Sequence, residues 1–238
     1  MPEHDETANV AILRGVSPSI GRCELTYLER EPIDLERAVA QHAAYAALLR
    51  DLGLEVVEIP ADPDLPDCCF VEDVAVVLDG LAVLTRPGAA SRRGEIPAVE
   101  KALARFRPLA RVEAPATLEG GDVLGVGRTL YVGHSPRTNA AGIEGLRALA
   151  EPLGYRVVAV PVTGCLHLKS AVTALDDGHL LANADWRDPA PLRGRVLVEV
   201  APEEAGAAHG LRVAGRGVAH PGVPRTRGRG VAGGHDVR

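Results

Sequence analysis

The clearest signature of the fold is the stretch EAPATLEGGDVLGVGRTLYVGHSPRTN, residues 113–139. It predicts a complete structural unit in one pass: a strand ending at Pro115, a turn over 119–122, a β-hairpin, and a closing Pro-Arg-Thr. Weaker copies of the same unit occur before and after it. We therefore interpret the stretch as one module of a repeated architecture.

The copies keep one order of elements. DCCFVED at 67–73 leads into VAVVL, an Asp-Gly turn, LAVLT and Ser-Arg-Arg; GCLH at 164–167 leads into SAVTAL and HLLAN; LRVA near residue 211 leads into GVAH and Pro-Arg-Thr. The residues that close the units recur at roughly 45 positions, a period typical of propeller-like arrays: Arg92, Arg137, Asn183 and Arg225. Strands that we expect to end in proline precede the copies, at Pro60, Pro115, Pro161 and Pro202. Chance similarity between short hairpins is the alternative, but four copies at a near-constant period argue against it.

Helices are predicted between the hairpins. A strand at 9–14 is followed by a helical face from Leu35 to Leu52, with Asp34 as its N-cap and Gly53 as its C′ residue. A second helix begins near Ile96 with Pro97 in its first turn, and a third begins after Asn139 and ends at Gly154. The fourth crossover, at 188–195, is too short and proline-rich for a full helix.

The alternation of hairpins, helices and return strands predicts an α/β fold. We expect one domain over residues 1–238, a five-module α/β-propeller of ββαβ repeats whose fifth module is incomplete. A doubly wound parallel sheet is the alternative, but the two-residue turn Asp79–Gly80 suits a type I′ hairpin and argues against an all-parallel sheet. In a propeller, the loops of all modules meet at one central cavity.

Composition narrows the class of protein. The chain has 46% hydrophobic and 3% aromatic residues and a net charge of −6, which favours a globular protein and neither nucleic acid nor a membrane as partner. The four cysteines are unpatterned, and nothing resembles a signal peptide or a membrane span. We expect a cytoplasmic protein with reduced thiols.

The loops that would meet carry clustered acids, namely Asp67, Glu72 and Asp73 in the second module and Glu119 and Asp122 in the third. Such carboxylates repel one another unless a positive group lies among them, either a cationic substrate or a metal. A metal is the less favoured choice, because no histidine-rich spacing accompanies the acids. Solvated loop acids are the alternative for any single residue. For the pair in FVED we favour a function.

Two arginines and one histidine complete the candidate set. Arg92 and Arg137 recur at what we take to be equivalent positions and could grip a carboxylate, with surface salt bridges as the alternative. His167 could be a core histidine in an apolar strand, but it lies one module after Glu119. We therefore predict that the two side chains form a hydrogen bond, as a general acid/base pair requires. Gly120 and Gly121 would allow a close approach beside Glu119.

Together, FVED, LTRPGAASRRGE, LEGGD, SPRTN and LHLK, in this order and spacing, resemble the dimethylarginine dimethylaminohydrolases, a family of guanidino-group-modifying enzymes. The resemblance runs from about Val10 to the end of the chain. It implies a five-module α/β-propeller that hydrolyses methylated arginine to citrulline and a methylamine without a cofactor or metal. The implied partner is thus a small guanidino substrate, and a homodimer is compatible with it.

The resemblance also implies residue roles. His167 would be the general acid/base and Glu119 its orienting carboxylate. The guanidinium end of the substrate would face Asp67, Glu72 and Asp73. Its amino-acid end would be held by Arg92 and Arg137, with Leu25 in a lid loop over the site. A cysteine thiolate would attack the guanidinium carbon.

The sequence departs from this pattern at the nucleophile. The family's cysteine lies near the C-terminus, after one more strand, and the present chain ends at Arg238, where that strand should begin. None of Cys23, Cys68, Cys69 and Cys165 matches its motif; Cys165 would share a strand face with His167, and we interpret it as a packing residue. We therefore expect impaired or absent hydrolysis. An arginine deiminase-like hydrolase, or a truncated, non-catalytic binder of arginine-like cations, are the alternatives.

The glycine- and arginine-rich segment 206–238 is interpreted as a loosened fifth module. A basic tail that contacts RNA is the alternative, but no aromatic side chain is present there to stack on bases.

Overall fold

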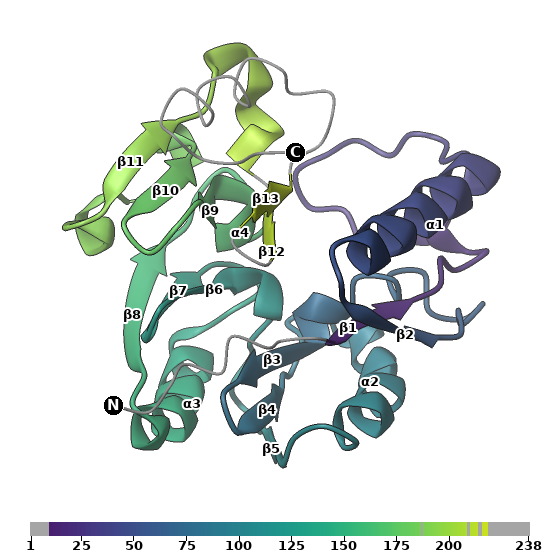
Figure 1. Cartoon of the computed structure of the whole chain (residues 1–238), viewed down its shortest axis with the longest axis horizontal. Helices are drawn as coiled ribbons and strands as arrows, with labels where there is room; N and C mark the ends of the chain where they lie inside the picture. The colour runs from purple at the N-terminus through teal and green to yellow at the C-terminus, as the bar shows by residue number, and fades with distance from the viewer. Residues whose placement is uncertain (1–9, 187, 209, 214–215, 219–238) are drawn as a thin grey trace.

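Three consecutive modules form three-stranded sheets with one strand order, in which an antiparallel hairpin is followed by a crossover and a parallel return strand. The computed structural model describes residues 10–186, 188–208, 210–213 and 216–218. The sheets consist of β3 (Ala75–Leu78), β4 (Leu81–Leu84) and β5 (Leu109–Arg111); β6 (Val123–Val126), β7 (Thr129–His134) and β8 (Arg156–Pro161); and β9 (Val172–Ala174), β10 (His179–Ala182) and β11 (Val196–Glu199). They surround a common centre, and the first strand of each sheet lies nearest the middle of the view (Figure 1). This arrangement confirms the predicted α/β class and its repeated module.

The first module has a single pair of parallel strands. α1 (Leu35–Asp51) connects β1 (Val10–Arg14) to β2 (Glu55–Ile59). The side chain of Asp34 accepts a hydrogen bond from the backbone N–H of Arg37, and Gly53 has a φ of 90° beyond the last turn. Both predicted ends of this helix are therefore confirmed.

The next two crossovers are helices, and the fourth is not. α2 is Ile96–Leu103 and begins with Pro97 in its first turn, as predicted. α3 is Ala140–Ala150, capped by Asn139 and followed by a 3₁₀ turn at Glu151–Leu153. In the fourth module only 3₁₀ turns at Ala184–Trp186 and Ala190–Leu192 precede β11. The prediction that no full helix forms there is confirmed.

Hydrophobic side chains fill the spaces between neighbouring sheets. Buried residues of β3 and β4 pack with those of β6, β7 and α3. Those of β6, β7 and β8 pack with β9 and β10. Apart from Tyr131, the large buried side chains in these layers are aliphatic, and the aromatic residues Tyr155 and Trp186 pack against them partly buried. Burial of apolar surface stabilises the layers by about 25 cal/mol per Å², so these contacts fix how loops of different modules meet.

Two predictions about the strands are wrong in part. β8 ends at Pro161 and β2 stops directly before Pro60, but β5 and β11 end well before Pro115 and Pro202. After β5 the chain makes one further bond, from the N–H of Val112 to the carbonyl of Leu84, and then turns. His167 does not lie in a strand; it precedes the helical turn α4 (Leu168–Ala171). β9 is correspondingly shorter than the predicted strand.

The last described elements are β12 (Leu211–Val213) and β13 (Arg216–Val218), which pair antiparallel. This hairpin agrees with the predicted LRVA–GVAH unit. It follows Gly210, whose N–H donates to the hydroxyl of Thr173 in β9 at 3.0 Å. The predicted Pro-Arg-Thr around Arg225 lies outside the described residues, so the incomplete fifth module and the extent of the domain stay predictions.

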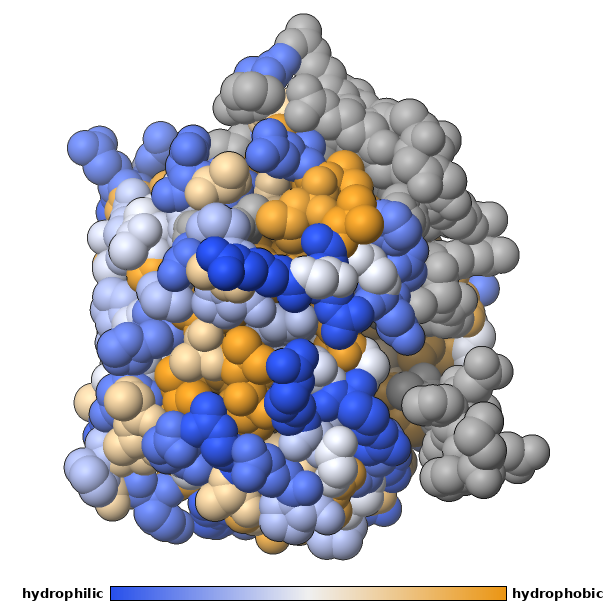
Figure 2. Space-filling model, turned by 90° about the vertical axis from the view of Figure 1, so that its left-hand side faces the viewer, coloured by the Kyte–Doolittle hydropathy of each residue, from blue (hydrophilic) through white to orange (hydrophobic). Residues whose placement is uncertain are grey.

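Within the described ranges, every helix is too short or too polar to cross a bilayer. Seen from the left-hand side of Figure 1, hydrophobic residues form small patches separated by charged and polar ones (Figure 2).

Candidate active site

Three neighbouring modules each bring one side chain to the same point, just before the first strand of their hairpin. Asp73 lies in the 3₁₀ turn Val71–Val74 before β3, and Glu119 precedes the 3₁₀ turn Gly120–Asp122 before β6. His167 precedes α4, which leads into β9. The repeated architecture thus converts sequence separations of 46 and 48 positions into contact.

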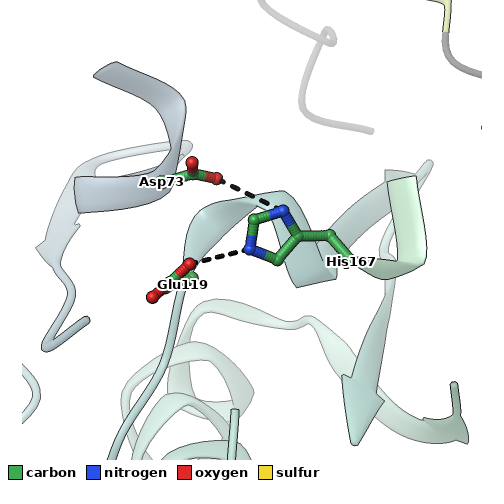
Figure 3. Close-up of side chains that lie close together, drawn as sticks. All are labelled: Asp73, Glu119 and His167. Carbon is green, nitrogen blue, oxygen red and sulfur yellow. Dashed lines mark hydrogen bonds and ion pairs between the residues drawn. The ribbon is translucent and has the colours of Figure 1, made fainter. Parts of the chain in front are cut away.

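His167 lies between two carboxylates (Figure 3). Its Nε2 is 2.7 Å from Oε2 of Glu119, and its Nδ1 is 3.9 Å from Oδ1 of Asp73. Glu119 is fully buried, and Asp73 and His167 are each 7% exposed. The predicted hydrogen bond between Glu119 and His167 is confirmed.

The electrostatics of this group favour a protonated imidazole. Burial alone would lower the pKa of His167, but the hydrogen bond with Glu119 and the charges of Asp73 and Asp122 outweigh it and raise the pKa. Burial would raise the pKa of Glu119, yet its hydrogen bond with His167 and the imidazolium charge hold it below the usual value. The pKa of Asp73 is lowered against burial by His167 and Arg92. The site therefore favours an imidazolium between carboxylates, a group that can donate a proton and take one back.

The two glycines beside Glu119 make this approach sterically feasible. A Cβ atom on Gly121 would lie 2.5 Å from Oδ1 of Asp73 and 2.6 Å from Nδ1 of His167. A Cβ on Gly120 would lie 1.9 Å from the carbonyl oxygen of Glu72. The N–H of Gly121 also donates to Oδ1 of Asp73 at 3.0 Å. The close approach predicted at Gly120 and Gly121 is therefore confirmed. The backbone of Glu72 approaches Gly120, and the side chains of Asp73 and His167 approach Gly121.

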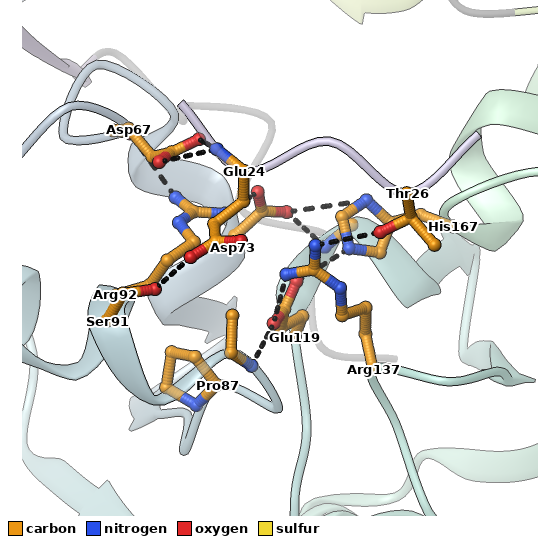
Figure 4. A network of polar contacts seen from close by, with 12 residues as sticks. Glu24, Thr26, Asp67, Asp73, Pro87, Ser91, Arg92, Glu119, Arg137 and His167 are labelled. Carbon is orange, nitrogen blue, oxygen red and sulfur yellow. Dashed lines mark hydrogen bonds and ion pairs between the residues drawn. The ribbon is translucent and has the colours of Figure 1, made fainter. Parts of the chain in front are cut away.

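Arg92 is buried beside Asp73 and holds it in place. It donates through Nη1 to Oδ2 of Asp73, and through Nε and Nη2 to the carboxylate of Glu95 at 3.0 and 2.8 Å. Further contacts reach the carbonyl oxygens of Asp67 and Phe70. Burial would lower the pKa of Arg92, but the hydrogen bonds to Glu95 and the charge of Asp73 raise it. Most N–H groups of Arg92 are therefore engaged within the protein. Figure 4 shows Arg92 beside Asp67 and Asp73.

Arg137 lies on the other side of the acid/base pair. Its Nη1 is 3.4 Å from Oε1 of Glu119, and its Nη2 donates to the hydroxyl of Thr26 at 3.1 Å. The two arginines are not equivalent, contrary to our prediction. Arg92 lies eleven residues after Leu81 and Arg137 eight residues after Thr129, although these are the first residues of β4 and β7. The difference arises because Arg92 belongs to an additional 3₁₀ turn, Ala90–Glu95, after its hairpin.

The remaining predicted residues lie around this centre. Asp67 accepts hydrogen bonds from the N–H of Glu24 at 3.1 and 3.2 Å, and burial raises its pKa. Leu25 is half-buried in the segment between Glu24 and Thr26. Glu72 is half-exposed and forms an ion pair of 2.9 Å with Lys169. Thus the loop carrying Leu25 contacts Asp67 through the N–H of Glu24 and Arg137 through the hydroxyl of Thr26.

None of the four cysteines combines exposure with a feature that stabilises a thiolate. Cys165 is buried and donates to the carbonyl of His167, and burial together with the charge of Asp122 raises its pKa to about 11. Burial raises the pKa of Cys69 to about 12 and also raises that of Cys68. Cys23 is buried at 8% exposure. The interpretation of Cys165 as a packing residue agrees with its place in the hydrophobic layer between β6–β8 and β9–β10.

Asp73, Glu119 and His167 also form a group that could hold a metal, since one ligand atom from each lies within 4.8 Å of the others. However, the two carboxylates face different nitrogens of the imidazole ring. One ion can bind only one of these nitrogens, whereas both can carry a proton. The arrangement therefore fits proton transfer better than metal binding.

Several residues that shape the site were not predicted from the sequence. Glu95 and Thr26 hold the two arginines, Lys169 pairs with Glu72, and Thr138 donates to Asp122. Their residue types are ordinary for a protein surface, and the partners of Thr26, Lys169 and Thr138 are distant in the chain. Only the motif SRRGE, with a glutamate three residues after an arginine, carried a local signal.

The fold and the buried histidine–carboxylate pair together place this chain among the α/β-propeller proteins with an acid/base pair at the centre. A family model described as "N,N dimethylarginine dimethylhydrolase, eukaryotic" matches residues 26–172. The chain is 48% identical over 198 residues to the N(G),N(G)-dimethylarginine dimethylaminohydrolase of Streptomyces coelicolor, covering 83% of this chain and 76% of the relative. It is 37% identical over 196 residues to the enzyme of the same name from Pseudomonas aeruginosa, covering 82% and 77%.

A solved structure agrees with these matches. A cysteine-to-serine mutant of the Pseudomonas aeruginosa enzyme, in complex with citrulline, superposes with a TM-score of 0.90 at 34% identity, covering 97% of this chain and 91% of that one. The chain belongs to the dimethylarginine dimethylaminohydrolase family, a family of hydrolases.

Proposed function

We propose that this chain binds methylated arginine and that its His167–Glu119 pair performs the proton transfers of its hydrolysis to citrulline and a methylamine. The observation that carries the proposal is the buried 2.7 Å contact between these side chains, with Asp73 on the opposite side of the ring. The names of its relatives supply the substrate class.

The acid/base pair suits both halves of such a reaction. In the first half, a nucleophile adds to the guanidinium carbon, and the imidazolium of His167 protonates the departing methylamine as the C–N bond breaks. In the second half, neutral His167 takes a proton from water, which adds to the same carbon and releases the nucleophile. Glu119 stabilises the charged ring and fixes its orientation throughout.

Charge complementarity supports the orientation of the substrate. The carboxylates of Asp67, Glu72 and Asp73 would receive the guanidinium, and Arg92, Arg137 and the loop of Leu25 would receive the amino-acid end. Arg137 keeps N–H groups beyond its two contacts, whereas Arg92 is largely engaged with Asp73 and Glu95. We therefore assign the larger share of carboxylate binding to Arg137.

The proposed reaction also needs a nucleophile. The raised pKa values of Cys68, Cys69 and Cys165, and the burial of Cys23, disfavour a reactive thiolate at any of the four positions. We infer that these 238 residues bind substrate but hydrolyse it slowly, because water alone must attack a resonance-stabilised guanidinium. Removal of one member of a group that acts together costs nearly as much as removal of all of it.

The test measures binding and turnover separately. Calorimetry with monomethylarginine should show binding to the 238-residue chain, while citrulline release should be slow. Appending a family-like C-terminal strand and cysteine should restore release, and Cys→Ser in that segment should abolish it. Rapid release by the 238-residue chain would refute the nucleophile inference, preference for arginine would favour a deiminase, and absence of binding would refute the proposal.

A further inference from the structure

Asp122 is a fully buried acid directly beneath the acid/base pair, and the proposed reaction does not use it. Its Oδ1 accepts a hydrogen bond from the backbone N–H of Leu168 at 2.9 Å. Its Oδ2 accepts from the hydroxyls of Ser135 and Thr138 at 2.6 and 2.7 Å. The donors come from two other segments, the loop of residues 135–138 and the start of α4, so the carboxylate joins both of them to its own turn.

Two of these contacts lead to the main chain of the acid/base pair. Leu168 directly follows His167, so fixing its N–H fixes the peptide from which the imidazole extends. The hydroxyl of Thr138 accepts in turn from the N–H of Glu119 at 3.1 Å. A series of hydrogen bonds therefore runs from Glu119 through Thr138 and Asp122 to Leu168. It connects the same two segments as the side-chain contact between Glu119 and His167.

Asp122 packs closely against Gly133. A Cβ atom on Gly133 would lie 2.4 Å from Oδ1 of Asp122 and 3.0 Å from Cβ of Leu168, so this strand residue has room for hydrogen only. The hydroxyl of Ser135 also accepts from the N–H groups of Arg137 and Thr138 at 3.1 and 3.2 Å. A displacement of Asp122 would thus move the loop that carries Arg137 as well.

Asp122 also acts through its charge. It accepts three hydrogen bonds, as an ionised carboxylate does. Burial raises its pKa, opposed by the charge of His167 and the three donors. The ionisable groups that face His167 are Glu119 at Nε2, Asp73 at the Nδ1 side and Asp122 beyond the Leu168 peptide. The nearby cations act on these acids: Arg92 and Lys169 on Asp73, and Arg137 on Glu119.

We propose that Asp122 is a positioning residue that sets the distance between Glu119 and His167 and favours the imidazolium form. The inference rests on the proposed function only in assigning proton transfer to that pair. The geometry it describes exists without substrate, so it can be tested without turnover.

The experiment is a histidine-resolved NMR titration of the 238-residue chain, with the His167 signals assigned by His167→Gln. Asp122→Asn keeps the shape and one acceptor but removes the charge. It should weaken or abolish the signal of the Nε2 proton shared with Glu119, and it should move the titration midpoint of His167 to lower pH. Asp79→Asn, at an exposed hairpin turn paired with Arg128, should change neither.

A second pair of variants keeps the test decisive if Asp122→Asn does not fold. Thr138→Val removes the hydroxyl between Asp122 and Glu119 at nearly constant volume, and Thr138→Ser retains it. The first should lose the Nε2 proton signal and the second should keep it. A folded Asp122→Asn or Thr138→Val with wild-type signal and midpoint would overturn the proposal. Slow citrulline release would leave it standing, since neither readout needs hydrolysis.

Discussion

At the scale of single residues, the protonation of His167 is linked to the stability of the fold. Its pKa is raised in the folded chain, chiefly by Glu119 against the effect of burial. A raised pKa stabilises the folded state fully below the unfolded value, about 6.5, and this contribution is lost as pH rises through the folded value. The lowered pKa of Glu119 acts in the opposite sense, contributing above its unfolded value of about 4.5. The ion pair therefore contributes most between these two limits.

The first prediction follows from that window. The difference in free energy of unfolding between wild type and His167→Gln should be larger at pH 6 than at pH 9, by about 1 kcal/mol for each pKa unit by which folding raises the value. Urea denaturation at both pH values measures it. His134→Gln, at the exposed end of β7, controls for loss of a histidine. A difference that grows toward pH 9 would contradict the raised pKa.

The second prediction concerns Gly121. An alanine here would place Cβ within 2.6 Å of both Asp73 and His167, and both side chains are buried and hydrogen-bonded. We expect Gly121→Ala to destabilise the fold by about 2 kcal/mol or more and to abolish ligand binding. Gly125→Ala in β6 is the matched control, because its Cβ would lie 3.7 Å from Leu130 and should be neutral or slightly stabilising. Equal effects in urea denaturation would refute the steric explanation.

The sequence allowed prediction of the Glu119–His167 contact because both residues are chemically distinctive and lie one module apart. It did not allow prediction of the burial of Arg92, because that depends on a 3₁₀ turn that delivers the arginine to Glu95 and Asp73. The repeat also predicted that Arg92 and Arg137 occupy equivalent positions. They do not, because the additional 3₁₀ turn moves Arg92 further from its hairpin. Side-chain type thus indicates which groups can pair, while loop geometry decides which ones do.

At the scale of elements, the helices followed their local signals, and the strands followed theirs only in part. Asp34, Asn139 and the glycines at 53 and 154 mark helix ends through their own backbone and side chains, so a single sequence reveals them. The ends of β5 and β11 depend on how far a neighbouring strand continues, which no proline encodes. The helical turn α4 likewise follows from the N–H of Leu168 bonding to Asp122, a contact across 46 positions.

The third prediction compares two helix caps. Asn139 accepts from the N–H groups of Gly142 and Thr117 at 2.8 and 3.1 Å and donates to the carbonyl of Pro115, so it also fixes the segment leading to Glu119. Asp34 caps α1 with one exposed hydrogen bond. Asp34→Ala should cost about 1 kcal/mol of unfolding free energy, and Asn139→Ala about 2 kcal/mol. Asn139→Asp, which keeps both accepted bonds, should recover most of the loss; equal costs for the two alanine variants would count against the bridging role.

At the scale of the whole molecule, the site exists only because the modules pack against one another. Glu72 and Lys169 come from the second and fourth modules and are 97 positions apart, yet they meet at 2.9 Å across the third. The hydrophobic layers between the sheets hold them there. The repeat in the sequence predicted that loops of these modules converge, but it could not predict that a lysine lies among the acids, because no feature of LHLK shows where its lysine points.

The last prediction uses this pair to test where the guanidinium binds. A ligand cation that binds Glu72 must compete with the ammonium of Lys169, which is held at the same carboxylate and repels a second positive charge. Because Glu72 is half-exposed, its interaction with a cation is worth about 1 kcal/mol. Glu72→Gln should therefore weaken monomethylarginine binding about threefold to tenfold in calorimetry, and Lys169→Met should strengthen it by a similar factor. Asp64→Asn removes an exposed acid whose backbone N–H only bonds to Asp62, and it should leave the affinity unchanged. If Glu72 serves only to hold Lys169, neither variant of the pair will change the affinity, and the guanidinium must then be bound by Asp67 and Asp73 alone.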